Sequence, residues 1–372
     1  LYGIITYILG MRSGKHEYKV MGLAPYADQE GVEEVLPLFD ELLRVEGLSF
    51  TGSLSTPAVA HRLERELRDK RFDWIAGAMQ RHCERLMREF TENALAATGA
   101  TRVTCAGGLF RNAKANMFLK DIDGVEHFTV CPSPSDEAAA IGAAYHGYER
   151  LTGKRPEPLD TIYLGPEYSE REIEDAIERL EIAKYCRIER PEDIEHTTAD
   201  LLAEGNIVAR FQGRMEFGAR ALGNRSILSN PSDPELTPVL NHQIKQRDFW
   251  MPFAPTILDE FQDQYIINPK NIASPHMMIG FETTPEGREA LKAAVHPFDG
   301  TIRPQILRES DNPAYHRLIR IFQERTGIGG ILNTSFNLHG DPIVCSPEDA
   351  LDTLLRSGLQ QLAIGPFLVS KL

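Results

Sequence analysis

The sequence has 372 residues, of which 42% are hydrophobic and 25% are charged, and its formal net charge is -14 at pH 7. This composition is typical of a soluble globular protein that is long enough for two domains. Neither a membrane-length apolar run nor a targeting signal is visible, so we predict a cytoplasmic protein that has no membrane partner. The acidic balance argues against a broad nucleic-acid-binding surface, and we expect no nucleic-acid partner.

The first 71 residues carry few clear patterns. The chain begins Leu1-Tyr2-Gly3 without a methionine and reads as the interior of a domain, so we expect it to be part of a longer protein. Residues 20–26 are apolar but contain glycine and proline, which favours a packed loop. Residues 31–71 carry charge runs with little periodicity, and no helix or strand is predicted there.

An α/β unit is predicted between residues 72 and 148. Its expected elements are a helix at 72–97, a strand at 102–106, a helix through Lys120, a strand at 127–131 and a helix at 137–148. Gly107-Gly108 follows the first strand and Ser135-Asp136-Glu137 follows the second. This order predicts that both turns lie at the same edge of a sheet.

The second half of the chain begins after a linker that is rich in proline at residues 152–168. Helices are expected at 170–182, 191–204, 235–243, 312–325 and 347–357, and strands at 184–189, 207–211, 226–229, 254–258, 277–281, 301–307, 330–333 and 362–369. These elements do not alternate strictly, which favours an α+β domain or an open mixed sheet over a doubly wound one.

Cations and glycines gather within residues 213–255. Arg214, Arg220 and Arg225 lie in the glycine-rich part, and Lys245 and Arg247 follow. Glycine lets backbone amides approach an anion closely, and the arginine fork matches pairs of phosphate or carboxylate oxygens. The stretch therefore predicts an anion site, although a solvated basic loop would have the same composition.

Three other features could contact a nucleotide or an anion. Gly107-Gly108, with Asn112 at the next helix start, would bring backbone amides toward a phosphate, although such turns are often only structural. Asp136 stands at a helix N-terminus, where helix capping explains a carboxylate equally well. Ser335 and Asn337 follow an apolar strand, and Arg303 adds a cation in another predicted strand.

Six motifs resemble the O-carbamoyltransferases of the NodU/CmcH type, in order and over nearly the whole chain. They are residues 19–26, 107–112, 135–137, 213–226, 252–255 and 332–337. The resemblance implies that residues 1–152 are the second half of an actin-like ATPase (RNase H-like) α/β domain that transfers the carbamoyl group. It implies that 153–168 are a linker and that 169–372 form a YrdC-like, mixed-sheet α+β domain.

The resemblance implies an ATP-dependent reaction in two stages. In the YrdC-like domain, carbamoyl phosphate and ATP would form carbamoyl adenylate. In the actin-like domain, the carbamoyl group would pass to the hydroxyl of a small-molecule acceptor. Mg²⁺ is expected with ATP. Fe²⁺ or another divalent metal is expected in the complete transfer domain, whose paired histidines belong to an N-terminal half that this chain does not contain.

The resemblance also assigns roles to residues. It implies the catalytic residues Lys245, Arg247, Ser335 and Asn337, and it suggests Arg214, Arg220, Arg225 and Arg303 as contacts for carbamoyl phosphate and ATP. In the transfer domain it implies Lys19, Gly107, Gly108 and Asn112 as nucleotide contacts and Asp136 as a metal ligand.

Two alternatives remain open from the sequence. The first is synthesis of threonylcarbamoyl adenylate for tRNA modification, which would require threonine, bicarbonate and tRNA as ligands. The acidic balance and the lack of a basic stripe count against it. The second is a non-catalytic nucleotide-binding module. A homodimer is compatible with the sequence, which identifies neither the acceptor nor the oligomeric state.

Overall fold

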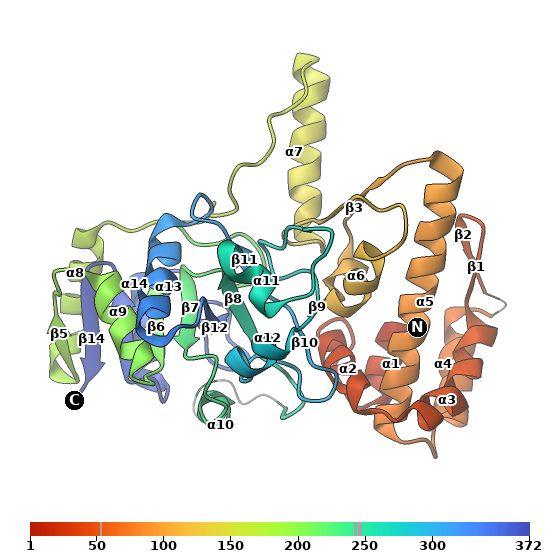
Figure 1. The fold of residues 1–372 in the computed structure, drawn as a ribbon, viewed down its shortest axis with the longest axis horizontal. Helices are drawn as coiled ribbons and strands as arrows, with labels where there is room; N and C mark the ends of the chain where they lie inside the picture. Colours follow the sequence, from red (N-terminus) through yellow and green to blue (C-terminus); the bar gives the residue numbers. More distant parts are fainter. Residues whose placement is uncertain (53, 242–243, 245–247) are drawn as a thin grey trace. The chain divides into compact units, whose positions relative to one another are not determined.

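The computed structural model of the chain describes residues 1–52, 54–241, 244 and 248–372 (Figure 1). It divides into two compact units. The first contains Leu1–Pro134 together with Lys270–Ile272 and Met278–Gly280, and the second contains Ser135–Pro269, Ala273–Met277 and Phe281–Leu372. The first unit therefore includes two short segments from the second half of the sequence.

The first unit is built around one long helix, α5 (Phe72–Thr98), which ends at Gly99 in the left-handed conformation. Its other helices are α1 (Tyr2–Ile8), α2 (Glu17–Leu23), α3 (Gln29–Leu42), α4 (Thr56–Glu66) and α6 (Ala113–Lys120). Helices α2, α3 and α6 pack against α5. The long helix was predicted from its apolar periodicity, and that prediction is confirmed.

The prediction for residues 20–71 is wrong. Residues 20–26 belong to α2 and to the 3-10 turn η1 (Ala24–Tyr26), because the proline is placed where a first turn tolerates it. Residues 31–71 contain most of α3, then the hairpin of β1 (Arg44–Glu46) and β2 (Ser49–Thr51), then α4. The charges in this stretch occupy the solvated faces of short amphipathic helices.

The predicted pair of strands is present in the first unit. Strands β3 (Arg102–Cys105) and β4 (His127–Val130) are parallel, so the turns that follow them leave the same edge. Segments from later in the sequence complete this region. The buried Asn116 side chain donates to the carbonyl of Met278 at 2.7 Å, and Lys270 Nζ donates to the carbonyl of Ile122 at 2.8 Å.

The second unit contains a mixed sheet of eight strands, in the order β11-β8-β12-β7-β6-β13-β14-β5. The strands are β5 (Cys186–Glu189), β6 (Val208–Phe211), β7 (Arg225–Ser229), β8 (Ala254–Leu258), β11 (Gln305–Leu307), β12 (Gly330–Ser335), β13 (Gln361–Ile364) and β14 (Phe367–Lys371). A separate two-stranded ribbon pairs β9 (Phe281–Glu282) with β10 (Thr301–Ile302). The chain is thus a mixed α/β protein with a mixed sheet, as the sequence predicted.

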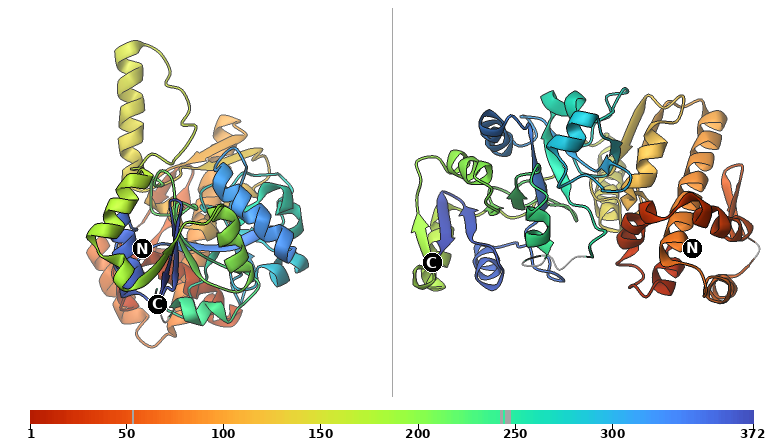
Figure 2. Two further views of the ribbon diagram at one scale, coloured as in Figure 1. Left: turned by 90° about the vertical axis from the view of Figure 1, so that its left-hand side faces the viewer. Right: turned by 60° about the horizontal axis from the view of Figure 1, so that its bottom comes forward.

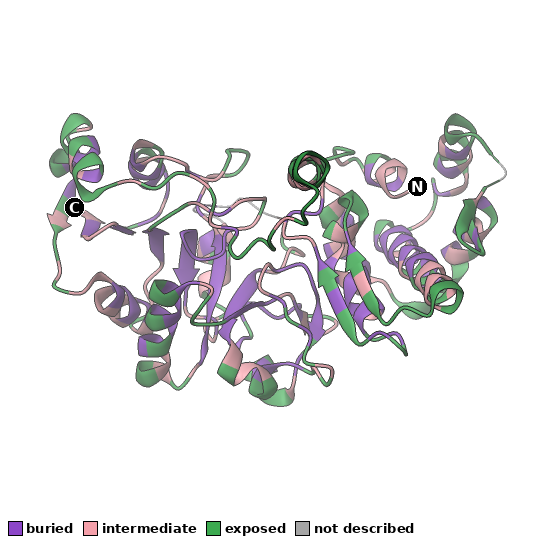
Figure 3. Cartoon of the chain, turned by 90° about the horizontal axis from the view of Figure 1, so that it is seen from above, coloured by how far each residue is buried: buried purple, intermediate pink, exposed green. Residues whose placement is uncertain are grey.

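Two pairs of helices cover the faces of this sheet, one pair on each side (Figure 2, left). On one face α9 (Ile194–Ala203) packs against α13 (Pro313–Thr326), and on the other α8 (Glu170–Arg179) packs against α14 (Pro347–Arg356). The central strands β6, β7 and β8 are buried along their whole lengths (Figure 3). Strands that are covered on both faces are usually apolar throughout. β6 and β8 contain one polar residue each, whereas β7 contains Arg225, Ser226 and Ser229.

Several boundaries differ from the predictions for physical reasons. The strand expected at 301–307 is two strands, because Arg303-Pro304 interrupts the pairing. The strand expected at 362–369 is the hairpin of β13 and β14, which turns at Gly365-Pro366, where Gly365 has φ 52°. The strand expected at 277–281 is reduced to the start of β9.

The remaining helices of the second unit are short or exposed. Helix α7 (Glu137–Thr152) has every residue at least partly exposed, and α10 (Leu236–Leu240), α11 (Gln262–Tyr265) and α12 (Pro285–Ala290) are short. Among the described residues, no helix combines the length and the apolar character that crossing a bilayer requires.

Candidate functional site

Several predicted site residues gather at one edge of the eight-stranded sheet, which we call the polar edge. Strand β6 ends at Phe211, which pairs with Arg225 at the start of β7, and Ser226 pairs with Ser335 at the end of β12. Strand β8 is antiparallel to β12, and β11 is parallel to β8, so both begin at this edge. The polar edge is therefore defined by where β6 and β12 end and where β7, β8 and β11 begin.

The connections at the polar edge carry the predicted residues. Arg214 and Arg220 lie in the loop between β6 and β7, Asn337 follows β12 by two residues, and Arg303 precedes β11 by two residues. The sheet thus brings together cations and polar groups that are more than a hundred residues apart in sequence. Lys245 and Arg247, which precede β8, lie outside the described residues.

A buried glutamate fixes the loop between β6 and β7. Glu216 is 5% exposed, and its Oε1 accepts hydrogen bonds from the amides of Leu222 at 2.7 Å, Asn224 at 2.8 Å and Arg225 at 3.2 Å. A carboxylate oxygen that accepts hydrogen bonds from three amides holds the loop in one conformation. Glu216 was not predicted from sequence, where it reads as one more charge in a polar loop.

Arg225 is fully buried and is held by the loop itself. Its guanidinium donates to the carbonyls of Gln212 at 2.8 Å and Gly213 at 3.1 Å, and it stacks 3.7 Å from the ring centroid of Phe211. Burial lowers the pKa of Arg225 to about 10, so the side chain remains charged at neutral pH. These contacts make Arg225 a scaffold of the loop, while its contact with a phosphate stays a prediction.

The other three described arginines that were predicted at this site are less buried. Arg214 is exposed and donates Nε and Nη2 to the carbonyls of Tyr163 and Leu164 at 3.1 and 3.0 Å. Arg303 is half-buried and donates to the carbonyl of Met277 at 2.9 Å, and Arg220 is half-buried as well. Arg214 is consequently the exposed guanidinium of the loop, anchored on one side by backbone carbonyls.

Ser335 and Asn337 form a polar turn at the end of β12. Ser335 Oγ donates to Asn337 Oδ1 at 2.7 Å, and Asn337 Nδ2 donates to the carbonyl of Asp341 at 2.6 Å. Both residues are half-buried. The hydroxyl and the amide are therefore oriented before any ligand binds, which is the arrangement that reduces the entropic cost of binding.

A cavity of about 370 Å³ opens beside the loop, within the second unit. Its lining includes Tyr168, Phe211, Gln212, Gly213 and Pro366. Gln212 Nε2 donates to the carbonyl of Gly365 at 2.7 Å, which ties the loop to the β13–β14 turn. The cavity is large enough for a small ligand and combines aromatic walls with polar groups.

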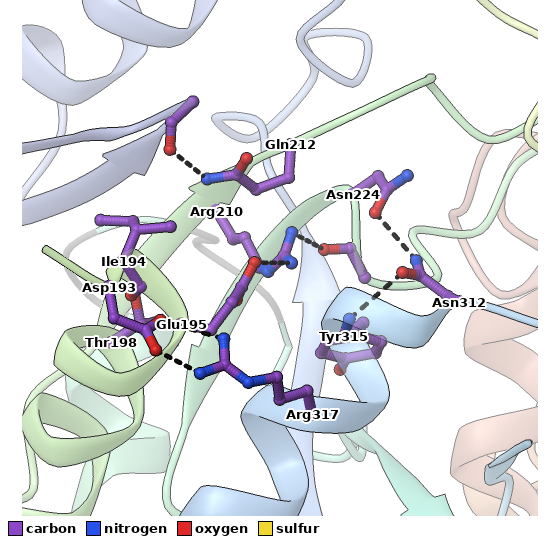
Figure 4. Close-up of polar contacts among 12 residues, drawn as sticks. Asp193, Ile194, Glu195, Thr198, Arg210, Gln212, Asn224, Asn312, Tyr315 and Arg317 are labelled. Atoms are coloured by element: carbon purple, nitrogen blue, oxygen red, sulfur yellow. Dashed lines mark hydrogen bonds and ion pairs between the residues drawn. The ribbon is translucent and has the colours of Figure 1, made fainter. Parts of the chain in front are cut away.

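A buried polar network supports the loop from the side of α9 and α13 (Figure 4). Arg210 is 1% exposed, and its Nη2 lies 2.8 Å from Oε1 of Glu195 on α9. The Arg210 guanidinium also lies 5.7 Å from the ring centroid of Tyr315 on α13. Asn312 Nδ2 donates to Asn224 Oδ1 at 2.9 Å, which joins α13 to the loop. This network was not predicted from the sequence, where an arginine in an otherwise apolar strand is the signal that could have indicated it.

The predicted nucleotide contacts of the first unit lie on three elements. Gly107 has φ 108° and precedes the 3-10 turn η2 (Gly108–Arg111), and both glycines are exposed. Asn112 caps α6 by accepting from the amide of Ala115 at 3.0 Å, and Lys19 is half-buried on α2. The capping role explains Asn112 without a ligand, and nucleotide binding by these residues stays a prediction.

Asp136 is exposed at the N-terminus of α7, in the second unit. Within the described part of the chain, it belongs to no cluster of three metal-ligating side chains; the one such cluster is Asp259, Glu260 and His316. A single exposed carboxylate fits a metal only as one ligand among several, so the predicted metal role of Asp136 rests on ligands that these described residues do not supply.

We expect His276, which is half-buried, to make the stability of the protein depend on pH. Burial lowers the pKa of His276 to about 4. Its neighbour Ser274 is held to β11, since Ser274 Oγ donates to the carbonyl of Pro304 at 3.0 Å. In the unfolded chain this histidine takes up a proton at about pH 6.5, whereas in the folded chain it does not. The unfolding free energy therefore has its full value above that pH and decreases as the pH falls toward 4.

We expect the unfolding free energy of the wild type to fall by on the order of 2 kcal/mol from this group between about pH 6.5 and 4. The variant His276→Gln should show a shallower slope in urea titrations over that range. The variant His196→Gln is the matched control and should keep the wild-type slope. A His276→Gln slope equal to that of the wild type would rule out this contribution.

Two family models match this chain. The model described as "Carbamoyltransferase N-terminus" matches residues 1–145, and the model described as "Carbamoyltransferase C-terminus" matches residues 199–371. An uncharacterised protein of Methanocaldococcus jannaschii is 32% identical over 380 residues, covering 100% of this chain and 61% of its own length. The nodulation protein NolO of Bradyrhizobium diazoefficiens is 34% identical over 360 residues, covering 95% of this chain and 66% of its own length.

The chain belongs to the carbamoyltransferase family, which confirms the resemblance found in the sequence. It is also similar to the 3'-hydroxymethylcephem-O-carbamoyltransferase of Amycolatopsis lactamdurans, at 30% identity over 261 residues, 70% of this chain and 47% of that enzyme. The chain spans 61%, 66% and 66% of the lengths of the first three curated relatives.

One solved structure, full-length HypF in the phosphate- and nucleotide-bound form, aligns with 46% of this chain and 21% of that chain. The sequence identity is 21% and the TM-score is 0.34. A similarity at that level carries no argument about fold or function.

Proposed function

We propose that this chain is the C-terminal portion of an ATP-dependent O-carbamoyltransferase and that the polar edge forms carbamoyl adenylate from carbamoyl phosphate and ATP. The observation that carries the proposal is the gathering of Arg214, Arg220, Arg303, Ser335 and Asn337 at one edge of one sheet. Under this proposal residues 169–372 are the YrdC-like domain, residues 153–168 are a linker, and residues 1–152 belong to the actin-like transfer domain.

The donor set at the polar edge fits these substrates. Guanidinium groups pair with phosphate oxygens in forks, and a serine hydroxyl with an amide can hold a carbamoyl group, which both donates and accepts hydrogen bonds. Lys245 and Arg247, which lie outside the described residues, would add two further cations. Mg²⁺ bound with ATP would supply further charge neutralisation, and the residues named here would bind and orient the rest.

Each residue of the polar edge has a proposed role in the formation of carbamoyl adenylate. To form carbamoyl adenylate, carbamoyl phosphate loses inorganic phosphate to water, and an oxygen of the resulting carbamate bonds the α-phosphorus of ATP while pyrophosphate leaves. The arginines would stabilise the negative charge that accumulates on the leaving groups. Ser335 and Asn337 would position the carbamate for attack. The cavity walls at Tyr168 and Phe211 offer an apolar surface for the nucleobase.

The second stage belongs to the whole protein. Lys19, Gly107, Gly108 and Asn112 are proposed to contact the nucleotide during transfer, and Asp136 to contribute one ligand to an Fe²⁺ or other divalent ion. The acceptor is proposed to be a hydroxyl of a small molecule, because one relative is named as an O-carbamoyltransferase of a hydroxymethylcephem. Neither a nucleic acid nor a membrane is required by this reaction, and a homodimer is compatible with it.

Release of pyrophosphate from ATP tests this proposal against its rival. We expect release that depends on carbamoyl phosphate and is not supported by threonine with bicarbonate. Ser335→Ala should lower the rate of pyrophosphate release about tenfold, because the variant loses one hydrogen bond to a charged group.

Ser370→Ala is the matched control for that assay, because Ser370 is also half-buried but pairs with Gln361 at the start of β13, opposite the polar edge. It should retain the wild-type rate. Release supported by threonine with bicarbonate would favour the tRNA-modification alternative. Nucleotide binding without release would favour a non-catalytic module.

A further inference from the structure

We propose that Asp259, Glu260 and His316 bind a divalent transition-metal ion of the zinc class, separately from the polar edge. The three side chains can each offer one ligand atom, and these atoms all lie within 4.8 Å of one another. Strand β8 begins at the polar edge and ends at Leu258, so this cluster lies beyond the opposite end of the strand. We call it the DEH cluster, and the following structural features support it.

Rigid elements hold the DEH cluster. Asp259 and Glu260 open the 3-10 turn η5 (Asp259–Phe261) directly after β8, and His316 lies in the first turns of α13. The neighbour of His316, Tyr315, donates its hydroxyl to Thr256 Oγ1 of β8 at 3.0 Å. Ligands on a strand end and on a helix anchored to that strand are pre-organised, which lowers the cost of assembling a metal site.

The histidine provides an independent indication of a ligand. His316 is 7% exposed, and its Nε2 lies 3.4 Å from Oε2 of Glu260. That distance is longer than the usual range of about 2.7–3.2 Å for such a hydrogen bond. The contact between the buried imidazole and the carboxylate is therefore a long one, and an ion between the two groups would contact both.

An arginine orients the carboxylate toward the histidine. Arg320 Nη2 lies 2.6 Å from Oε1 of Glu260, and so the other oxygen, Oε2, faces His316. Outer partners of this kind fix the direction of a metal-binding side chain. With a neutral imidazole, the two carboxylates and Arg320 leave one net negative charge, which a divalent cation would offset.

The second carboxylate lies beside the first. Asp259 and Glu260 are consecutive residues, and each offers a carboxylate oxygen within 4.8 Å of the other ligand atoms. A divalent cation between them would be attracted by both carboxylates. The cluster thus combines a buried imidazole, an oriented carboxylate and a second carboxylate nearby.

The ligand chemistry selects the class of ion. One imidazole with carboxylate oxygens suits Zn²⁺ and similar transition metals, whereas Ca²⁺ and Mg²⁺ prefer oxygen ligands alone. Three protein ligands leave a position for water. Binding would link the end of β8 to α13, and it should therefore stabilise the folded protein.

Titration of the complete chain, without an affinity tag and without nucleotide, tests the proposal. We expect Zn²⁺ to bind at one site by calorimetry, Co²⁺ to give a visible absorption spectrum when bound, and either ion to raise Tm. Glu260→Gln and His316→Gln should each weaken binding more than tenfold. Arg320→Gln removes only the outer partner and should weaken it about tenfold.

His196→Gln is the matched control. It removes a half-buried histidine whose Nδ1 lies 3.1 Å from Asp200 and whose Nε2 lies 2.9 Å from Arg325 Nη2. It should keep wild-type affinity. Because Glu260 lies at the surface, its variant tests the site even if the buried His316→Gln fails to fold. Absence of Zn²⁺ and Co²⁺ binding to the wild type, or unchanged affinity in Glu260→Gln, would overturn the proposal. Both results are independent of the proposed formation of carbamoyl adenylate from carbamoyl phosphate at the polar edge.

Discussion

Glu195→Ala is expected to lower the free energy of unfolding by about 3–5 kcal/mol. The reason is the position of Arg210, which is 1% exposed and has Glu195 as its ion-pair partner at 2.8 Å. Removing the carboxylate leaves a guanidinium that is buried and uncompensated, and its desolvation is then no longer offset by the ion pair. Urea unfolding at neutral pH measures the change.

A double-mutant cycle and an exposed pair provide the controls. Arg210→Met combined with Glu195→Leu should recover most of the loss, because apolar side chains of similar volume often replace a buried pair at little cost. Arg317→Gln breaks the neighbouring ion pair between Arg317 and Asp193, in which the arginine side chain is 54% exposed. This variant should lose less than about 1 kcal/mol of unfolding free energy. Equal losses in Glu195→Ala and Arg317→Gln would contradict the buried-pair account.

Arg225→Ala is expected to cost about 3 kcal/mol of unfolding free energy, because it removes a fully buried side chain and leaves the part-buried carbonyls of Gln212 and Gly213 without this donor. It also removes the stacking on Phe211 at 3.7 Å. Arg225→Lys keeps the charge but loses the fork, so it should be intermediate. Thermal and urea unfolding of the purified variants measure both effects.

The matched control is Arg214→Ala, which removes the exposed arginine of the same loop. It should change stability by less than about 0.5 kcal/mol while weakening carbamoyl phosphate binding. If Arg225→Ala left stability unchanged, Arg225 would not be the scaffold of the loop. In that case its guanidinium would be available to contact a phosphate, as the sequence alone predicted.

Local sequence patterns correctly predicted the helices and strands that have a clear apolar run or apolar periodicity. The boundaries of β8 are those expected from Ala254 to Leu258, and α5 follows its apolar periodicity closely. The patterns failed where short elements follow one another, as in α3, the β1–β2 hairpin and α4. They also failed at Gly365, where one glycine converts a predicted strand into a hairpin.

The candidate site could be predicted only in part from the sequence. The gathering of Arg214 and Ser335 at one edge depends on strand order, which no local pattern encodes. Sequence composition could not distinguish the buried scaffold residue Arg225 from the exposed Arg214, because both are arginines in one glycine-rich loop. The roles of Glu216 and His316 depend on partners brought together by the fold, so they became visible only in the structure.

The most direct test of the central claim is calorimetric titration of this chain with ATP and with carbamoyl phosphate. The account predicts that both ligands bind with Kd values at or below about 1 mM, about 4 kcal/mol of binding free energy. It also predicts that Arg214→Gln weakens the binding of carbamoyl phosphate relative to the wild type. Absence of binding of both ligands to the wild-type chain at that concentration would contradict the assignment of the polar edge as the site of carbamoyl adenylate formation.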